Sequence, residues 1–238
     1  MEREIFFKMD EIEECHWWFQ VQRRLVKRFF LLRRHALFLD IGCGTGNTLS
    51  CLSLFEGVGL DIEPLALEIC RAKKLPRLLR ADASSLPFQD ESFHGILILG
   101  VLYHQGVKEE GEVLKEAWRV LKREGILLVT EPAFEFLRRP HDIVEHTRKR
   151  YTREELAQLV AGAGFKIVKT SYVYSYALPL LLLIKFLRLK KEGSDLYLPP
   201  LWINTLFRLL GYLEVKLLSF LSFPFGSTVF VLGRKEAR

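Results

Sequence analysis

One short stretch, residues 36–49 (ALFLDIGCGTGNTL), constrains the fold of this chain more than any other. It opens with an apolar run around Asp40, which is typical of a strand that is covered on both faces. Three alternating glycines follow, and their lack of Cβ atoms permits unusual φ values and close approach of a ligand to the backbone. The helix expected next would point free N–H groups at that ligand. The glycines are Gly42, Gly44 and Gly46.

Two acidic residues indicate the kind of ligand. Asp40 lies two residues before the first glycine, and Asp61 ends the next apolar run, residues 58–61. An acid at the tip of a second parallel strand can accept hydrogen bonds from both hydroxyls of a ribose. The glycine spacing is G-x-G-x-G followed by Asn47, whereas dinucleotide-binding enzymes use G-x-G-x-x-G. The pattern therefore predicts a nucleoside ligand other than a dinucleotide.

The stretch D-I-G-C-G-T-G-N, together with L-D-I-E-P at residues 60–64, resembles the class I S-adenosylmethionine-dependent methyltransferases, among them the type 11 and ubiquinone-biosynthesis-like members. The resemblance implies S-adenosyl-L-methionine as methyl donor and S-adenosyl-L-homocysteine as product. It also implies a Rossmann-like α/β sandwich whose seven-stranded, mostly parallel sheet has the order 3-2-1-4-5-7-6. The cofactor-binding residues expected from it are Asp40, Gly42, Cys43, Gly44, Gly46, Asp61, Ile62, Asp82, Ala83, Leu99 and Trp17.

Length and composition fit one folded domain of 238 residues with a formal net charge of +6. We expect an N-terminal helical cover (1–35), a core (36–171), an apolar helical insert (172–226) and a last strand with a tail (227–238). The four cysteines form no C-x-x-C pair, which predicts a reducing compartment and no metal site. The start of the chain lacks a signal-peptide pattern, and no uncharged apolar run reaches spanning length, so a cytoplasmic location is expected.

The N-terminal cover is predicted as one amphipathic helix over about residues 10–34, with an acidic head and a basic tail. It contains H-W-W-F at residues 16–19. In relatives a similar segment covers the cofactor or the substrate, and this assigns Trp17 to the site. The alternative is that these aromatic residues only pin the helix to the sheet.

Asp82 follows the third expected strand, at residues 77–81, within A-D-A…L-P-F. The resemblance implies that its carboxylate accepts a hydrogen bond from the adenine amino group. The alternative is an N-cap, a frequent role for Asp.

The methyl group should lie after the fourth strand, near residues 100–105. An oxygen nucleophile would need a base. His104 is the first choice because it follows the tip of that strand, although any single histidine can equally have an ordinary structural role. The chain lacks [DNS]-P-P-[YFW] and has no cysteine after Cys70, and both absences count against nucleic-acid methylation. The candidate catalytic residues are His104, Glu131, His141 and His146.

The insert at 172–226 is apolar and repeatedly interrupted by Lys or Arg. It could be extra helical core or a homodimer face, or it could lie in a membrane interface or form an acyl-chain groove. We favour a small hydrophobic or lipid-linked acceptor, reached by peripheral contact with the cytoplasmic membrane face. The alternatives are an RNA methyltransferase, since the chain is basic, and a catalytically silent regulatory protein with the same fold.

Overall fold

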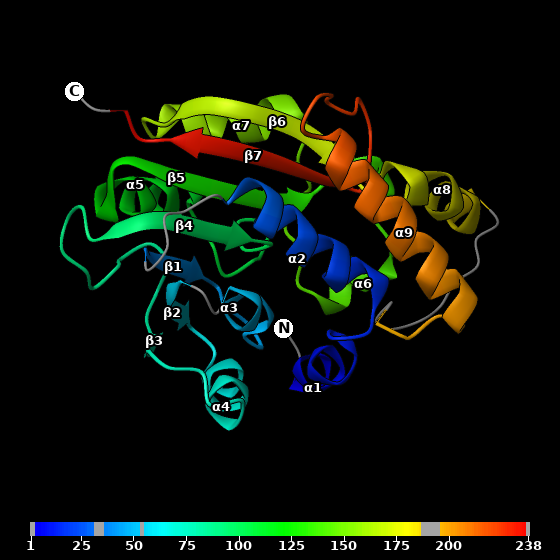
Figure 1. Ribbon diagram of the computed structural model, residues 1–238, viewed down its shortest axis with the longest axis horizontal. Coiled ribbons are helices and arrows are strands. Elements are labelled where there is room, and N and C mark those ends of the chain that lie inside the picture. The colour runs from blue at the N-terminus through cyan, green and yellow to red at the C-terminus, as the bar shows by residue number, and fades with distance from the viewer. Residues whose placement is uncertain (1–2, 31–35, 53–54, 187–195, 237–238) are drawn as a thin grey trace.

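The computed structural model describes residues 3–30, 36–52, 55–186 and 196–236. The described residues form a seven-stranded sheet in the order β3-β2-β1-β4-β5-β7-β6 (Figure 1). β7 is antiparallel to β5 and β6, and the other pairs are parallel. The predicted fold class is therefore confirmed. The strands are β1 (Leu37–Ile41), β2 (Glu56–Asp61), β3 (Leu78–Arg80), β4 (Phe93–Leu99), β5 (Leu121–Pro132), β6 (Lys166–Val173) and β7 (Thr228–Arg234).

Helices cover both faces of the sheet, because successive side chains of a strand point to opposite faces. In β1, Leu39 and Ile41 pack in the core that α5 and α7 share, whereas Phe38 packs in the core that α2 and α9 share. The helices are α1 (Arg3–Ile12), α2 (Trp17–Phe29), α3 (Asn47–Cys51), α4 (Pro64–Ala72), α5 (Glu110–Val120), α6 (Pro140–Val144), α7 (Arg153–Gly162), α8 (Leu178–Phe186) and α9 (Leu201–Leu217), with short 3-10 turns η1 (Glu135–Leu137) and η2 (Ser175–Ala177).

The prediction of one helix over residues 10–34 is wrong. Helix α1 ends at Ile12, and α2 begins at Trp17. His16 is the N-cap of α2, and its Nδ1 accepts a hydrogen bond from the backbone N–H of Trp18 at 3.2 Å. The break turns the Glu13 carboxylate inward, toward Thr45 and Lys73. The last part of the predicted helix, residues 31–34, lies outside the described residues.

Helix α7 begins where the sequence predicts. The Oγ1 of Thr152 accepts from the backbone N–H of Glu155 at 3.2 Å, and the Glu155 carboxylate accepts from the Thr152 N–H at 2.8 Å. This reciprocal pair is the capping box expected from the T-R-E-E spacing.

The segment between β6 and β7 forms α8 and α9, and residues 187–195 of it lie outside the described residues. One face of α9 packs against α2 and the sheet, where Val215 and Leu218 are buried. The two helices approach so closely at Gly211 that a Cβ there would lie 2.3 Å from a methyl carbon of Val21. Among the helices described, none has the length and hydropathy needed to cross a membrane.

Candidate functional site

Residues 42–46, which we call the glycine turn, join β1 to α3 at the carboxyl end of the sheet (Figure 1). All three glycines have positive φ, between 53° and 82°, which favours glycine. A Cβ on Gly42 would lie 2.4 Å from Val101, and one on Gly46 would lie 2.3 Å from Leu75. A Cβ on Gly44 would have no neighbour within 4 Å. The backbone at Gly44 therefore has open space beside it, as a ligand that approaches the turn would require.

Asp61 connects the tip of β2 to the glycine turn. Its Oδ2 accepts a hydrogen bond from the Gly44 N–H at 2.9 Å, and its Oδ1 accepts from the Glu63 N–H at 2.9 Å. Asp40 is buried next to it, and burial, with the charge of Asp61 second, raises the pKa of Asp40 to about 8. Burial also raises the pKa of Asp61. A cation bound near these two carboxyl groups would favour their ionised forms.

Asp82 and Cys43 are the other polar members of the predicted cofactor set. Asp82 is exposed after β3, and its Oδ1 accepts from the backbone N–H of Ser84 at 2.8 Å and from its hydroxyl at 2.7 Å. It therefore shapes a turn and caps no helix. Cys43 is buried, and hydrogen bonding to Cys70 together with burial raises the pKa of the Cys43 thiol, so that it stays neutral.

Three side chains, those of Glu13, Thr45 and Lys73, join the N-terminal segment to the glycine turn. The Glu13 carboxylate accepts hydrogen bonds from Thr45 Oγ1 and from Lys73 Nζ, and it is only 2% exposed. Lys73 also pairs with Asp10 at 2.6 Å. Arg23 of α2 adds a hydrogen bond to Asn47 Oδ1 at 2.9 Å. These contacts fix the position of the aromatic residues that follow.

Trp17 belongs to an aromatic cluster built from distant parts of the chain. Its ring lies 5.7 Å from that of Tyr174 and 5.2 Å from that of Phe207, both nearly edge-on. Its backbone N–H donates to Asn204 Oδ1 at 2.8 Å. Trp17 thus packs on α9, and it also faces the cavity described next.

A cavity of about 1380 Å³ runs from the glycine turn to α8 and residues 196–207. At one end it borders the glycine turn and the tips of β2 and β4. At the other end its wall is apolar, formed in part by Leu180, Ile184, Pro199 and Ile203. The predicted site residues that line it are Trp17, Gly42, Gly44, Asp61, Ile62, Asp82, Ala83, Leu99, His104, Glu131 and His141, whereas Asp40, Cys43, Gly46 and His146 are not part of its lining.

Glu131 is the second-last residue of β5, and both oxygens of its carboxylate accept hydrogen bonds. Its oxygens accept hydrogen bonds from three consecutive backbone N–H groups, those of Val101 (3.1 Å), Leu102 (2.9 Å) and Tyr103 (3.1 Å). Burial raises the pKa of Glu131 to about 8. The carboxylate thus fixes the loop after β4 at the place where the methyl group is expected.

The geometry of His104 restricts its use as a base. Its Nδ1 accepts a hydrogen bond from the Gly106 N–H at 3.0 Å, so the neutral ring carries its proton on Nε2. Burial lowers the pKa of His104. His146 lies beside it, with the ring centroids 5.8 Å apart. In this arrangement Nδ1 already accepts a hydrogen bond and Nε2 already carries a proton, so neither nitrogen of the neutral ring can readily take up another proton.

His141 lies on α6, one turn before Glu145. Its Nε2 is 3.1 Å from the Glu145 carboxylate, and both residues line the cavity. Beneath them Asp142 pairs with Arg150 at 2.7 Å, and both of these side chains are buried. Burial alone would favour neutral Asp142, but the Arg150 guanidinium lowers the pKa of this carboxyl. The ion pair makes α6 a rigid support for a histidine that a carboxylate orients.

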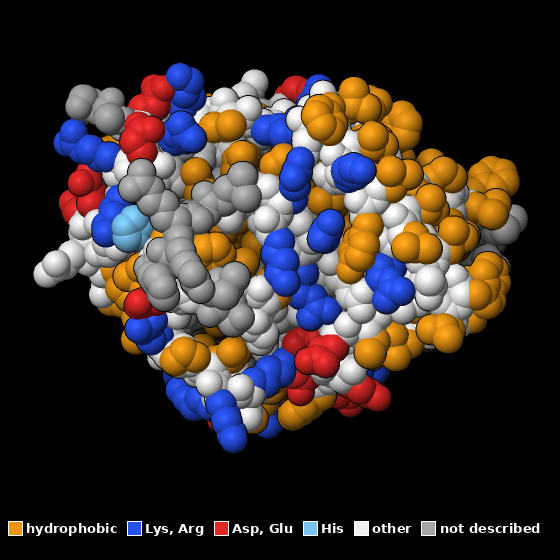
Figure 2. All heavy atoms as spheres, viewed as in Figure 1, with side chains coloured by type: hydrophobic (Ala, Val, Ile, Leu, Met, Phe, Trp, Pro, Cys, Tyr) orange, Lys and Arg blue, Asp and Glu red, His pale blue; other side chains and the backbone are white. Residues whose placement is uncertain are grey.

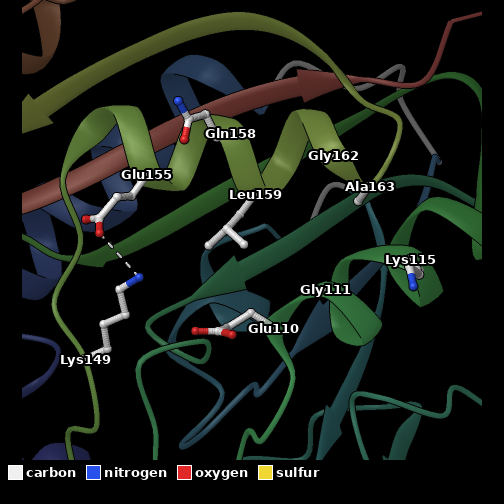
Figure 3. Close-up of a pocket in the computed structure, with 9 residues that line it drawn as sticks. All are labelled: Glu110, Gly111, Lys115, Lys149, Glu155, Gln158, Leu159, Gly162 and Ala163. Carbon is white, nitrogen blue, oxygen red and sulfur yellow. Dashed lines mark ion pairs between the residues drawn. The ribbon is translucent and has the colours of Figure 1, made fainter.

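A second, smaller cavity of about 430 Å³ lies between α5 and α7. Figure 3 shows two of its lining residues, Lys149 and Glu155, extending toward one another, and their charged groups lie 3.5 Å apart. None of the predicted site residues lines it. The large cavity at the glycine turn is therefore the candidate functional site.

Comparison with known proteins identifies the part of the chain that carries this turn. Residues 39–129 match the family described as "Methyltransferase domain". The match runs from β1 into β5 and so includes the glycine turn, Asp61 and the loop after β4. Residues 39–129 are a methyltransferase domain. Together with the sheet order, this confirms the resemblance to class I S-adenosylmethionine-dependent methyltransferases.

The two relatives described next are both named methyltransferases, but their names give different substrates. Human "Probable tRNA methyltransferase 9B" is 37% identical over 95 residues, 40% of this chain and 21% of that protein. "Demethylmenaquinone methyltransferase" of Chlorobaculum tepidum is 30% identical over 123 residues, 49% of each chain. The chain thus spans about half or less of the lengths of the curated relatives it matches.

The likeness of the whole fold extends further than the sequence match. The crystal structure of an S-adenosylmethionine-dependent methyltransferase from Thermotoga maritima superposes with a TM-score of 0.63 at 22% identity. That superposition covers 98% of this chain and 96% of the other.

The sequence did not indicate several residues that shape the site. Glu145 could have been found, because a carboxylate four residues after a histidine faces it on a helix. The contact of Glu13 with Thr45 and Lys73, and that of Asn204 with Trp17, join residues 32 to 187 positions apart. Such long-range contacts leave no local sequence signal.

Proposed function

We propose that the protein transfers a methyl group from S-adenosyl-L-methionine to a small hydrophobic or lipid-linked acceptor. The observation that carries this proposal is the single cavity with two unlike ends. One end borders the glycine turn and Asp61 of the methyltransferase domain, and the other is an apolar wall formed by α8 and residues 196–207.

The residues at the first end fit the cofactor. Gly44 leaves room for its close approach, and Asp61 can exchange its backbone hydrogen bonds for the ribose hydroxyls. Asp82 and Ala83 would border the adenine. The buried carboxyl of Asp40 would ionise when the cofactor binds and would then stabilise the positive charge of its sulfonium and ammonium groups. The cofactor supplies an activated methyl group on a sulfonium, so the contribution of the protein is largely orientation of the acceptor.

We assign the base for an acceptor hydroxyl to Nδ1 of His141, because Nε2 faces the Glu145 carboxylate and therefore carries the proton of the neutral ring. Glu145 orients its ring and stabilises the imidazolium that proton uptake would create. His104 and Glu131 have positioning roles in this scheme, because Nδ1 of the former and the carboxylate of the latter already accept backbone hydrogen bonds.

A methyl-transfer assay tests this proposal. The protein is incubated with methyl-labelled S-adenosylmethionine and either organic-solvent extracts rich in lipids and quinones or total RNA, and labelled products are identified by mass spectrometry. We expect label in the hydrophobic extract, and much less label with Asp61→Ala when the cofactor concentration is limiting. Label in RNA alone would move the protein to the activity that its tRNA methyltransferase relative suggests, and no label in either extract would contradict the proposal.

A further inference from the structure

Helix α9 exposes apolar side chains and buries polar ones, whereas a helix at a protein surface normally does the reverse. It buries two polar side chains, Asn204 and Glu214, and it exposes a row of large apolar ones. Trp202 is 70% exposed, Leu209 57% and Leu213 53%. These positions are separated by seven and four residues and therefore lie on one side of the helix.

The buried polar residues fix this orientation. Asn204 accepts from the Trp17 N–H at 2.8 Å and donates to the Cys15 carbonyl at 2.8 Å. The Glu214 carboxylate accepts from the backbone N–H groups of Tyr174 (2.7 Å) and Ser175 (2.8 Å). Rotating α9 to hide its apolar row would break these buried hydrogen bonds, and leaving such groups unpaired is costly. The exposure is thus built into the fold.

The apolar surface continues from α9 to the entrance of the cavity. On α8, Leu180 lines the cavity and is also 41% exposed, whereas Leu183 and Phe186 point outward. Figures 1 and 2 show α8 and α9 at the same end of the molecule, with hydrophobic side chains gathered over them. Monomeric proteins rarely leave so large an apolar surface in water. We call these exposed residues of α8 and α9 the apolar end.

The charge beside the apolar end identifies what covers it. Figure 2 shows a band of Lys and Arg side chains next to the hydrophobic area. Arg24 lies 5.5 Å from the Tyr212 ring, and Arg28 Nε donates to Ser219 Oγ at 2.7 Å, which places both cations at α9. Lys216 is exposed on α9 itself, while α2 has no acidic residue and Glu214, the one acid of α9, is buried.

We propose that the apolar end is a docking surface for an anionic lipid bilayer, from which a hydrophobic acceptor enters the cavity beside α8. Its large apolar side chains would lie among the acyl chains, and the cations of α2 and α9 would face the phosphates of the head groups. A second copy of the chain would bring like charges together. The entry route depends on the proposed function, whereas the docking itself does not.

Co-sedimentation with vesicles tests the surface without cofactor or acceptor. The intact protein is mixed with vesicles of phosphatidylcholine alone or of phosphatidylcholine with phosphatidylglycerol, at low and at high salt. We expect binding to the anionic vesicles to be about tenfold stronger than to the neutral ones, and to weaken as salt rises.

Substitutions separate the apolar and the charged contributions. Leu209→Gln with Leu213→Gln should weaken binding to anionic vesicles by about tenfold or more, and Lys216→Glu should weaken it less. The matched control is Val168→Gln on β6, which changes a side chain of similar exposure, 51%, outside the apolar end and should leave binding unchanged.

Three outcomes would overturn the docking surface: the wild type ignores anionic vesicles, the double variant binds them as well as the wild type, or the wild type is a dimer that the double variant converts to monomer. The last outcome would show that a second copy covers the apolar end. Calorimetry with S-adenosylmethionine gives an independent result. Vesicle binding without cofactor binding would refute the proposed function and leave the surface standing.

Discussion

The two ends of the cavity are built in different ways. We call the end that borders Gly44 and Asp61 the cofactor end. It is formed by strand tips and turns within residues 39–129, and the geometry of each turn follows from nearby residues such as Gly44 and Asp61. We call the opposite end, where the apolar wall lies, the acceptor end. It is formed by α2, α6, α8 and residues 196–207, which meet only in the folded chain. A site for a fixed cofactor can thus be formed by a local sequence motif, whereas segments far apart in the sequence form the proposed site for the acceptor.

The largest expected effect is at the acceptor end. His141→Ala should lower turnover by about 10²–10⁴-fold, because it removes the proposed base, and should leave cofactor affinity near the wild-type value. Turnover is measured with labelled cofactor and the responsive extract, and affinity is measured by calorimetry. Glu145→Gln should cost less, since it weakens the orientation of the ring and keeps the ring itself.

His104→Ala is the matched control for that experiment, because His104 lines the same cavity and was the first choice from sequence. We expect a loss of less than about tenfold. If instead His104→Ala shows the large loss and His141→Ala the small one, His104 is the base and its hydrogen bond from Gly106 opens during the reaction.

The next effect is at the cofactor end. Asp61→Ala should weaken S-adenosylmethionine binding by about 1.5–3 kcal/mol, the scale of a hydrogen bond to a charged group. Asp61 also holds the Gly44 N–H, so Asp61→Asn is needed to separate lost ribose contacts from a disordered turn. Unchanged affinity in a folded Asp61→Ala protein would remove Asp61 from the site.

The contrast between the two ends also explains what the sequence could predict. The sheet order, the strands and the capping box at Thr152 depend on short-range patterns and on family resemblance, and all of them are confirmed. The single N-terminal helix was wrong because periodicity cannot show that Glu13 turns inward to reach Lys73. Likewise, apolar content alone could not reveal that α9 buries Asn204 and exposes Trp202.

The third effect is a pH dependence of cofactor affinity. Burial raises the pKa of Asp40 from 3.8 to about 8, so ionisation of this carboxyl costs stability as pH rises between those values. A bound sulfonium and ammonium would lower this pKa, and binding would then release a proton below pH 8. Affinity should therefore rise with pH, by up to about tenfold per pH unit, and level off near the pKa of the free protein.

Calorimetry in two buffers of different ionisation enthalpy measures this proton release. Asp40→Asn should abolish the dependence due to Asp40 and should stabilise the cofactor-free protein at alkaline pH. The ammonium group of the cofactor titrates in the same range, but it contributes equally to both proteins, so their difference isolates Asp40. Equal pH profiles would show that Asp40 does not sense the cofactor.

The smallest effect concerns the boundary between the cofactor end and its N-terminal cover. Thr45→Val removes the hydroxyl that donates to the buried Glu13 carboxylate, and should lower the free energy of unfolding by about 1–2 kcal/mol in urea denaturation. Thr45→Ser keeps the hydroxyl and should cost less. Because Thr45 does not line the cavity, cofactor affinity should stay within about threefold of wild type in both variants. A tenfold loss of affinity without loss of stability would mean that the cover and the glycine turn bind the cofactor as one unit, and the cofactor end would then depend on long-range contacts as the acceptor end does.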